Sequence, residues 1–510
     1  MDEVMKMPAP NLKLLLEPLV EKNPFTTMAK SHGNGHIVSF QEAKKMLPEP
    51  VLSEHGGFVE MYWRAWEIAW ANLRRPHNDN QFLSPYITAV NRPLVSLWES
   101  NFAALYGMYG RRAFNFMGAL DNFYAHQQKD GFITKEISTE NGADLFLAYT
   151  PNATAPNFTA WVEWRYYRAT GDNGRLADVF WPLMAYHRWC RRNRTWPNGL
   201  YWATGESSNL YNQPRVPDSQ YHHRHWTWVD ANMQAILNCR VLEQFAIQLE
   251  QKELVQELAD ERAELIRMVN DCLWDEEASF YKDIDAMGRF SKVKSASAYW
   301  GLLDKDIIPG KRLAAFIRHL RESWAFKLNH CIPSLSADSE GYNSSTGHGY
   351  RGGVWPPLNY IVIIGLNNVG QTTLAHRIAV NHLENMWAVY QHTDTFWENY
   401  APEAAQQGEP AEKDFVGPSG VSPISLLLEN VIGVRADWPL RRVTWDRLLD
   451  SSQTYGVKNY PFGPDGTFDI VGDSKKVIVT TDVSFTLTIE NHGFTIQTAV
   501  PSGTSEIDLT

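Results

Sequence analysis

Helical periodicity, which recurs from Gly57 to about Val434, constrains the fold of this chain more than any other feature. Apolar residues return every three or four positions, the spacing of one face of an α-helix, and strand-like alternation is rare there. The clearest stretches are residues 229–245, 253–273, 313–320, 358–366 and 373–387. Turn and helix-ending pairs such as Gly171-Asp172 and Asn198-Gly199 separate such stretches. Roughly a dozen helices with long connections predict a layered all-α domain.

Periodicity alone leaves two helical architectures open. Six concentric hairpins would close into a toroid, whereas stacked hairpins would form a superhelix. Tetratricopeptide and armadillo superhelices have a fixed repeat length, and no such period appears in this sequence. At 510 residues the chain exceeds one ordinary hydrophobic core, so we expect one large toroidal domain with an appendage or a few smaller domains.

The pattern changes to strands after Pro439. Residues 476–490 read as strand, and residues 494–500 alternate again. The link Asn491-His492-Gly493 has the composition of a hairpin turn. We therefore expect a helical domain over residues 57–438 and a small β-rich region over residues 439–510. Residues 1–56 are expected to form an N-terminal extension that packs on the helical domain.

Charge and composition narrow the classes of partner. The net charge is −11 without a dense Lys/Arg run, which argues against nucleic acid and against an anionic polymer as substrate. No apolar stretch is long enough to cross a bilayer and no secretory leader is evident, so we expect no membrane partner and a cytoplasmic location. The 4 cysteines form no CxxC pair, so we expect no metal site and no cofactor.

Two segments combine residue types that suit a sugar-processing site. Residues 347–360 hold Tyr350, Arg351 and Trp355 in a glycine-rich loop ahead of a helix-starting proline pair. Residues 393–402 place Glu398 among aromatic residues before a proline. A carboxylate there can activate water. The 20 tryptophans suit sugar stacking but equally an ordinary core, so these two loops, and not the composition, carry the prediction.

These segments closely resemble the motifs of glycoside hydrolase family 63, of its mannosylglycerate hydrolase-like members and of the related trehalases. Similar short stretches follow in the same order: Trp98-Glu99-Ser100, residues 127–133, residues 228–232 and residues 415–421. The resemblance covers most of residues 57–435. It implies an (α/α)6 toroid with a small C-terminal β appendage. It also implies an inverting glycoside hydrolase of a small α-linked carbohydrate substrate, with Glu398 as general base.

The resemblance further implies which residues bind the sugar. Arg351 and Trp355 match the loop that lines the sugar pocket in the family. Glu99 stands where relatives carry Asp, and its extra methylene changes how a sugar hydroxyl is held. The full set that we expect to bind substrate is Trp98, Glu99, Gln128, Trp202, Tyr211, Arg215, Trp228, Asp230, Tyr350, Arg351, Gly352, Trp355 and Trp397.

The expected general acid departs from the family pattern. Relatives carry an Asp in a Gly-x-Asp-x-x-Pro-Arg stretch, and residues 209–215 place Tyr211 at that position. Tyrosine has an ordinary pKa of about 10 and is a poor proton donor at neutral pH. Glu206, shortly upstream, is the first substitute and Asp230 the reserve. The competing interpretation of Glu206 is that it only caps a turn.

A second class of function stays open. Loss of the usual acid is compatible with a sugar-binding or lyase-like protein on the same toroid. Tyr211 and the histidines of residues 222–225 would supply the proton-transfer groups of a lyase. The presence of both the Arg351 and the Glu398 motifs favours hydrolysis, because a lyase needs no water-activating glutamate.

Overall fold

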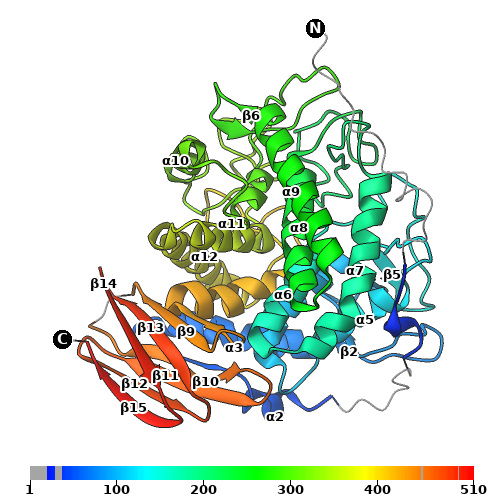
Figure 1. Ribbon diagram of the computed structural model, residues 1–510. Helices are drawn as coiled ribbons and strands as arrows, with labels where there is room; N and C mark the ends of the chain where they lie inside the picture. Colours follow the sequence, from blue (N-terminus) through cyan, green and yellow to red (C-terminus); the bar gives the residue numbers. More distant parts are fainter. Residues whose placement is uncertain (1–19, 29–36, 450–451, 492, 510) are drawn as a thin grey trace.

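The computed structural model describes residues 20–28, 37–449, 452–491 and 493–509 (Figure 1). Helices of an outer and an inner layer alternate along residues 56–432. The outer helices are α3 (Gly56–Ala71), α5 (Gly118–Ala125), α7 (Asn173–Asn193), α9 (Lys252–Cys272), α10 (Gly310–Arg318) and α12 (Thr372–Thr393). The inner ones are α4 (Leu97–Gly107), α6 (Thr159–Thr170), α8 (Val229–Gln248), the 3-10 helix η3 (Ala296–Leu302), α11 (Pro356–Asn368) and the π-helix η6 (Ser422–Ile432).

The inner layer closes into a ring. In chain order α4, α6, α8, η3, α11 and η6 each contact the next, and η6 contacts α4 again. All residues of η3 and η6 are buried, as expected of helices that lie inside the barrel. This is the (α/α)6 type of barrel, and the superhelical alternative is therefore wrong.

Helix ends follow ordinary capping chemistry. Asp172 is the N-cap of α7, and its side chain accepts a hydrogen bond from the backbone N–H of Arg175. The preceding Gly171 ends α6 with a positive φ of 73°. A Cβ at that glycine would lie 2.4 Å from the Trp438 ring, so both its backbone conformation and its packing require glycine.

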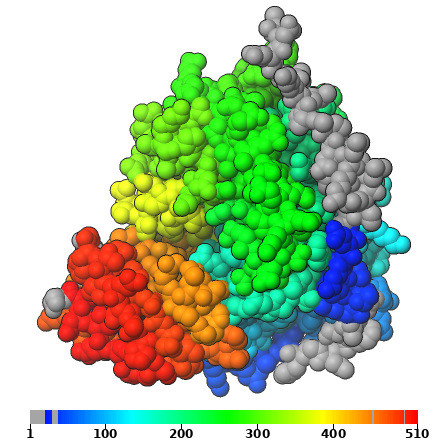
Figure 2. All heavy atoms as spheres, viewed as in Figure 1, coloured from blue at the N-terminus to red at the C-terminus, as the bar shows by residue number. Residues whose placement is uncertain are grey.

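The C-terminal region consists of two packed sheets. One sheet has the order β1-β10-β11-β12-β15 and the other β14-β13-β9-β8. Their strands are β1 (Glu49–Leu52), β8 (Val434–Asp437), β9 (Arg442–Arg447), β10 (Tyr455–Phe462), β11 (Gly466–Gly472), β12 (Lys476–Thr481), β13 (Phe485–Asn491), β14 (Phe494–Val500) and β15 (Gly503–Asp508). Phe462, Phe468 and Phe485 pack against one another between the sheets. Figure 2 shows this region, in orange and red, against the barrel.

Two expectations about strands meet different outcomes. The β13–β14 hairpin is confirmed, with Asn491 opposite Phe494. Residues 476–490 are not one strand, because the chain leaves one sheet at the end of β12 and enters the other at the start of β13. About 39% of the chain is helical and 17% is strand. The all-α class is therefore not confirmed for the whole chain, although the barrel is.

Part of the N-terminal extension belongs to the β region. Strand β1 pairs antiparallel with β10, and the Asn23 side chain binds the carbonyl of Tyr124 at the end of α5. The short helices of this extension are η1 (Pro24–Thr26) and α2 (Phe40–Lys44). Residues 1–19 and 29–36 lie outside the described residues. The boundaries 1–56, 57–438 and 439–510 stay predictions.

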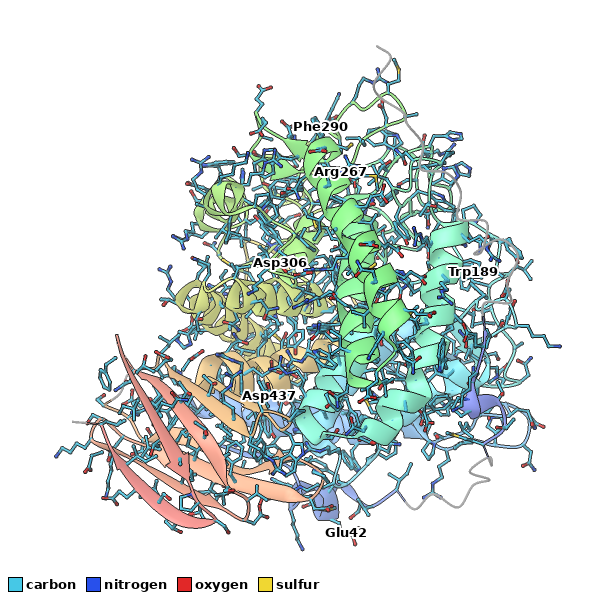
Figure 3. The ribbon with its side chains drawn as sticks, in the orientation of Figure 1. Glu42, Trp189, Arg267, Phe290, Asp306 and Asp437 are labelled. Carbon is cyan, nitrogen blue, oxygen red and sulfur yellow. The ribbon has the colours of Figure 1, made fainter. Side chains whose placement is uncertain are left out.

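Short elements complete the fold. They are η2 (Met108–Gly110), η4 (His319–Arg321), η5 (Pro418–Val421) and the two-stranded ribbons β2 (Leu73–Arg74) with β3 (Tyr86–Ile87), β4 (Leu94–Ser96) with β5 (Glu136–Ser138), and β6 (Trp274–Asp275) with β7 (Phe280–Tyr281). Side chains fill the space between the helices, and Asp437 lies where the barrel meets the β region (Figure 3). In the described part of the chain, no helix is long and apolar enough to span a membrane.

Candidate active site

The N-terminal ends of the inner helices share one end of the barrel, because alternate helices of successive hairpins run in the same direction. Trp98 and Glu99 lie in the first turn of α4, Asp230 lies in the first turn of α8, and Trp355 is the N-cap of α11. Val354 and Tyr400 exchange two backbone hydrogen bonds of 2.8 and 3.0 Å. The Arg351 loop and the Glu398 segment are therefore paired at this end.

Glu398 is a half-buried carboxyl set among other charges. Burial raises its pKa to about 7, the nearby Arg92 guanidinium opposes the rise, and the Glu412 carboxylate adds to it. Arg92 Nη2 lies 2.6 Å from Glu412 Oε1, and Arg92 Nη1 lies 3.6 Å from Glu99 Oε1. A carboxyl with such a pKa is suited to proton transfer near neutral pH.

Glu99 is the second carboxyl of this group. Burial raises its pKa to about 7, the Arg92 cation opposes the rise, and the negative charges of Glu398 and Glu136 add to it. Only 14% of its side chain is exposed. Glu99 and Glu398 therefore both lie near the Arg92 guanidinium.

Tyr211 lies close to both glutamates that were expected to be catalytic. Burial raises its pKa to about 12, and the charges of Glu398 and Glu206 contribute to the rise. Its ring lies 5.3 Å, edge-on, from the ring of Tyr350. The Tyr350 ring in turn stacks on Trp355 at 3.9 Å. At neutral pH the Tyr211 hydroxyl keeps its proton, so it is a hydrogen-bond donor and not an acid.

Glu206 is held by side chains and does not cap its own turn. Its Oε2 lies 3.3 Å from Lys135 Nζ, and its Oε1 accepts a 3.2 Å hydrogen bond from Gln220. The Glu206 side chain is 27% exposed, whereas Lys135 is buried. Both carboxylate oxygens of Glu206 are therefore engaged by neighbouring side chains.

Arg351 offers an uncommitted guanidinium. Its Nε is buried without a hydrogen-bond partner, and among the described residues no carboxylate forms an ion pair with it. A Cβ on Gly341 would lie 2.8 Å from its Nη2, so the glycine leaves room for this side chain. Gly352, at a φ of 134°, donates its backbone N–H to Ser334 Oγ at 3.3 Å. The loop thus presents an arginine ready for a polar ligand.

Arg215, Asp230 and Trp228 form a buried cluster at the start of α8. All five N–H donors of Arg215 are used, by Asp230, Asp283 and Ser297. Both Asp230 oxygens accept from Arg215. The Arg215 guanidinium lies over the fully buried Trp228 ring at 4.6 Å. These contacts hold the start of α8 in place, and the expectation that the three residues touch substrate stays a prediction.

The remaining expected residues lie nearby in varied settings. Gln128 is exposed and donates to Asp144 at 3.0 Å. Trp98 packs edge-on against Phe102 and Phe158. Trp202 packs against His223 at 4.6 Å, and Trp397 donates from Nε1 to Thr393 at 3.2 Å. These contacts leave part of each ring exposed, since Trp98, Trp202 and Trp397 are half-buried.

Four charged residues of the site were missed by sequence reasoning: Arg92, Lys135, Glu136 and Glu412. Burial raises the pKa of Glu136, the Lys135 ammonium opposes the rise and the Glu206 charge adds to it. The four lie in loops or in the short strand β5, where no periodicity marks them. Two of them could have been found from their position in the sequence, because Lys135 and Glu136 closely follow the family-like stretch 127–133.

Two side-chain clusters resemble metal sites. His187, Cys239 and Glu261 are buried and mutually close, but Glu261 pairs with Arg191 at 2.6 Å and burial raises the pKa of the Cys239 thiol. In the loop 222–225, ring nitrogens of His222 and His223 accept backbone N–H groups, and burial together with the neighbouring histidines lowers the pKa of His223 to about 4. Existing contacts account for both clusters, and we assign no metal to either.

Comparison with known proteins places this site in a family. The family model described as "Mannosylglycerate hydrolase MGH1-like glycoside hydrolase domain" matches residues 95–415. An uncharacterized protein of Borreliella burgdorferi is 25% identical over 456 residues, which cover 85% of this chain and 91% of that protein. A mannosylglycerate hydrolase of Thermus thermophilus is 28% identical over 137 residues, 27% of this chain and 31% of that enzyme.

A solved structure supports the fold. The family 63 mannosylglycerate hydrolase of Thermus thermophilus in complex with glucose superposes with a TM-score of 0.58 at 22% identity, over 72% of this chain and 99% of that one. Together, the barrel and the carboxyl-rich end define a glycoside hydrolase. The chain belongs to the family of mannosylglycerate hydrolase MGH1-like glycoside hydrolase domains.

Proposed function

We propose that this protein hydrolyses a small α-linked glycoside with inversion at the anomeric carbon. Glu398 takes a proton from water as the water oxygen attacks that carbon, and Glu206 gives a proton to the departing glycosidic oxygen. Tyr211 lies near both carboxyls, since the charges of Glu398 and of Glu206 both contribute to its raised pKa. This shared neighbour is the observation that carries the proposal. An inverting pair must leave roughly 6.5–9.5 Å for the sugar and the water.

The surrounding residues suit a sugar. The free guanidinium of Arg351 donates to ring hydroxyls, Glu99 accepts from them, and the half-buried rings of Trp98 and Trp397 offer apolar faces. Tyr211, at the position where the family carries its acid, donates its hydroxyl proton as a hydrogen bond. Because a Thermus thermophilus relative is a mannosylglycerate hydrolase, mannosylglycerate belongs among the first substrates to test.

A panel of α-linked glycosides with product anomers read by NMR tests this function. Release of the β-anomer from an α-glycoside supports inversion, and release of the α-anomer would contradict it. The matched control is Glu398→Gln, which keeps the shape of the side chain and removes its basicity. Turnover that persists in this variant would come from another protein or another base.

Sugar binding without hydrolysis is the second candidate. Two observations favour it: a tyrosine stands at the position of the usual acid, and Lys135 pairs with Glu206. A lyase is less well supported, because a lyase tyrosine must give up its proton and burial raises the pKa of Tyr211 to about 12. Calorimetric binding of a glycoside that is never cleaved at any pH would select this candidate.

A further inference from the structure

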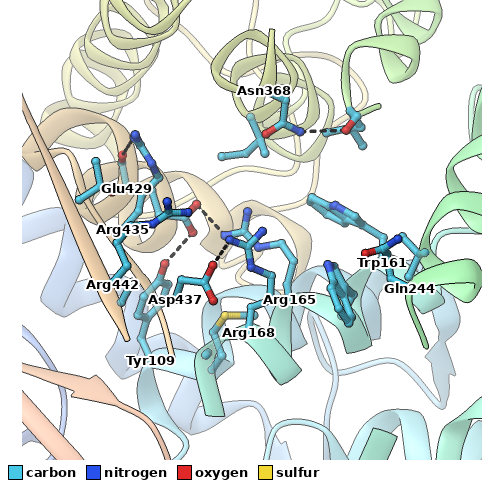
Figure 4. Close-up of a pocket in the computed structure, with 18 of the residues that line it drawn as sticks. Tyr109, Trp161, Arg165, Arg168, Gln244, Asn368, Glu429, Arg435, Asp437 and Arg442 are labelled. Atoms are coloured by element: carbon cyan, nitrogen blue, oxygen red, sulfur yellow. Dashed lines mark hydrogen bonds and ion pairs between the residues drawn. The ribbon is translucent and has the colours of Figure 1, made fainter. Parts of the chain in front are cut away.

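A large cavity of about 620 Å³ lies at the opposite end of the barrel (Figure 4). Its walls come from η2, from α6, from the C-terminal parts of α8 and α11, from η6, and from strands β8, β9 and β10. It contains none of the expected active-site residues. Its volume lies in the range of small-molecule sites, which are roughly 300–1,000 Å³.

The cavity carries an excess of positive charge. Seven Lys and Arg side chains line it against three carboxylates. Each carboxylate already has a cation: Glu429 lies 2.7 Å from Arg165, Asp437 pairs with Arg168, and Asp304 pairs at 2.7 Å with Arg262, which lies outside the lining. These three carboxylates are therefore already paired and do not neutralise the remaining Lys and Arg side chains of the cavity.

Three cations of the lining have no carboxylate partner among the described residues: Arg111, Lys305 and Arg442. Arg111 donates only to backbone carbonyls, of Gly463 at 2.7 Å and of Met108 at 2.9 Å among others, and its Nε is buried without a partner. Burial lowers the pKa of Arg111 to about 10. Lys305 and Arg442 are exposed, so they stand where a ligand from solvent meets the cavity.

Helix ends explain only part of this charge. The C-terminal ends of helices carry partial negative charge and attract cations, which accounts for Arg168 in the last turn of α6. Arg442 comes from β9, and Arg435 comes from β8. Arg435 donates to the backbone carbonyl of Glu429, near the C-terminal end of η6, at 3.3 Å and also pairs with Asp446, whereas the Arg442 side chain has neither kind of contact among the described residues.

We propose that this cavity binds a small organic phosphate. Guanidinium groups hold phosphate oxygens through forked, charge-assisted hydrogen bonds. Tyr109, Trp161, Trp164 and Tyr460 supply apolar and aromatic wall for the organic part, and Gln244 supplies polar contacts. The proposal is independent of the hydrolytic reaction, since no residue is shared between the two sites.

Isothermal titration calorimetry on the full chain tests the proposal with inorganic phosphate and phenyl phosphate as probes. Phenol is the uncharged counterpart, and citrate is the carboxylate counterpart. We expect phenyl phosphate to bind, phenol not to bind, citrate to bind more weakly, and affinity to fall as salt is raised. Absence of phosphate binding at millimolar concentration, or equal affinity for citrate, would overturn the proposal.

Variants locate the binding. Lys305→Glu with Arg442→Glu reverses two exposed charges, and Thr444→Asp adds a negative charge to the same wall of β9 without removing an ion pair. Each is expected to weaken phenyl phosphate about tenfold or more. Arg377→Glu, an exposed arginine of α12 outside the cavity, is the matched control and should bind normally. Equal affinity in all these variants, or loss of binding in Glu398→Gln, would overturn this location.

Discussion

Two substitutions that each remove one charge should move the acid limb of the pH–activity profile, where kcat/KM falls at low pH, in opposite directions. A general base works only when deprotonated, and burial raises the pKa of Glu398 to about 7. We therefore expect kcat/KM to fall as pH drops below about 7. The Arg92 cation lowers this pKa, and the Glu412 carboxylate raises it. Arg92→Gln should thus shift the acid limb to higher pH, and Glu412→Gln should shift it to lower pH.

The size of these shifts follows from Coulomb's law. A unit charge close to a carboxyl in a partly buried site shifts its pKa by roughly 1–3 pH units. Arg92 is shared with Glu99 and Glu412 at 3.6 and 2.6 Å, which reduces its effect on Glu398 to about one pH unit. Glu412→Gln also frees Arg92 to act on Glu398, so its two consequences have the same sign.

The assay is the pH dependence of kcat/KM, which reports the free enzyme. Glu99→Gln is the control, because burial also raises the pKa of Glu99 to about 7. If the acid limb disappears in Glu99→Gln but persists in Glu398→Gln, Glu99 is the titrating group. Shifts of the same sign in Arg92→Gln and Glu412→Gln would refute the electrostatic argument itself.

Three further substitutions test the site and its support. Glu398→Gln should reduce kcat by about 10²–10⁴-fold while calorimetry shows retained sugar binding; unchanged kcat would remove it as the base. Glu206→Gln should lose far more activity on glycosides with poor leaving groups than on those with good ones, and an equal loss would exclude it as the acid. Asp230→Asn leaves Arg215 partly unpaired in a buried network and should cost about 3 kcal/mol in urea unfolding. Asp271→Asn, in the exposed pair with Arg267, should cost less than about 1 kcal/mol.

Sequence reasoning identified several of the long helices. The expected ranges 229–245, 253–273 and 373–387 match α8, α9 and α12 closely, and of these α9 and α12 are outer helices with an exposed face. It missed η3 and η6, because a 3-10 helix and a π-helix do not follow the 3.6-residue period on which the prediction relied. The exchange of sheets between β12 and β13 was equally hidden, since a strand pattern does not tell which sheet a strand joins.

The parts of the site that lie within one sequence segment were predictable. The contacts that join different segments were not. The Arg351 loop and the Glu398 segment were visible as local motifs, but their pairing through Val354 and Tyr400 depends on the fold. Arg215 looked like a sugar ligand by its position in a motif. Its five donors are used inside the protein, and no sequence pattern reports whether a guanidinium is already occupied.

The proton for the leaving group is the hardest requirement that this site has to meet. Tyr211 does not supply it, because burial and two nearby glutamates raise its pKa to about 12. Glu206 is paired with Lys135, but Glu136 lies beside the same lysine and its own pKa is raised by burial and by Glu206. The raised pKa of Glu136 means that this carboxyl holds its proton to higher pH than an exposed glutamate does. The comparison of good and poor leaving groups in Glu206→Gln therefore decides whether Glu206 itself is the proton donor.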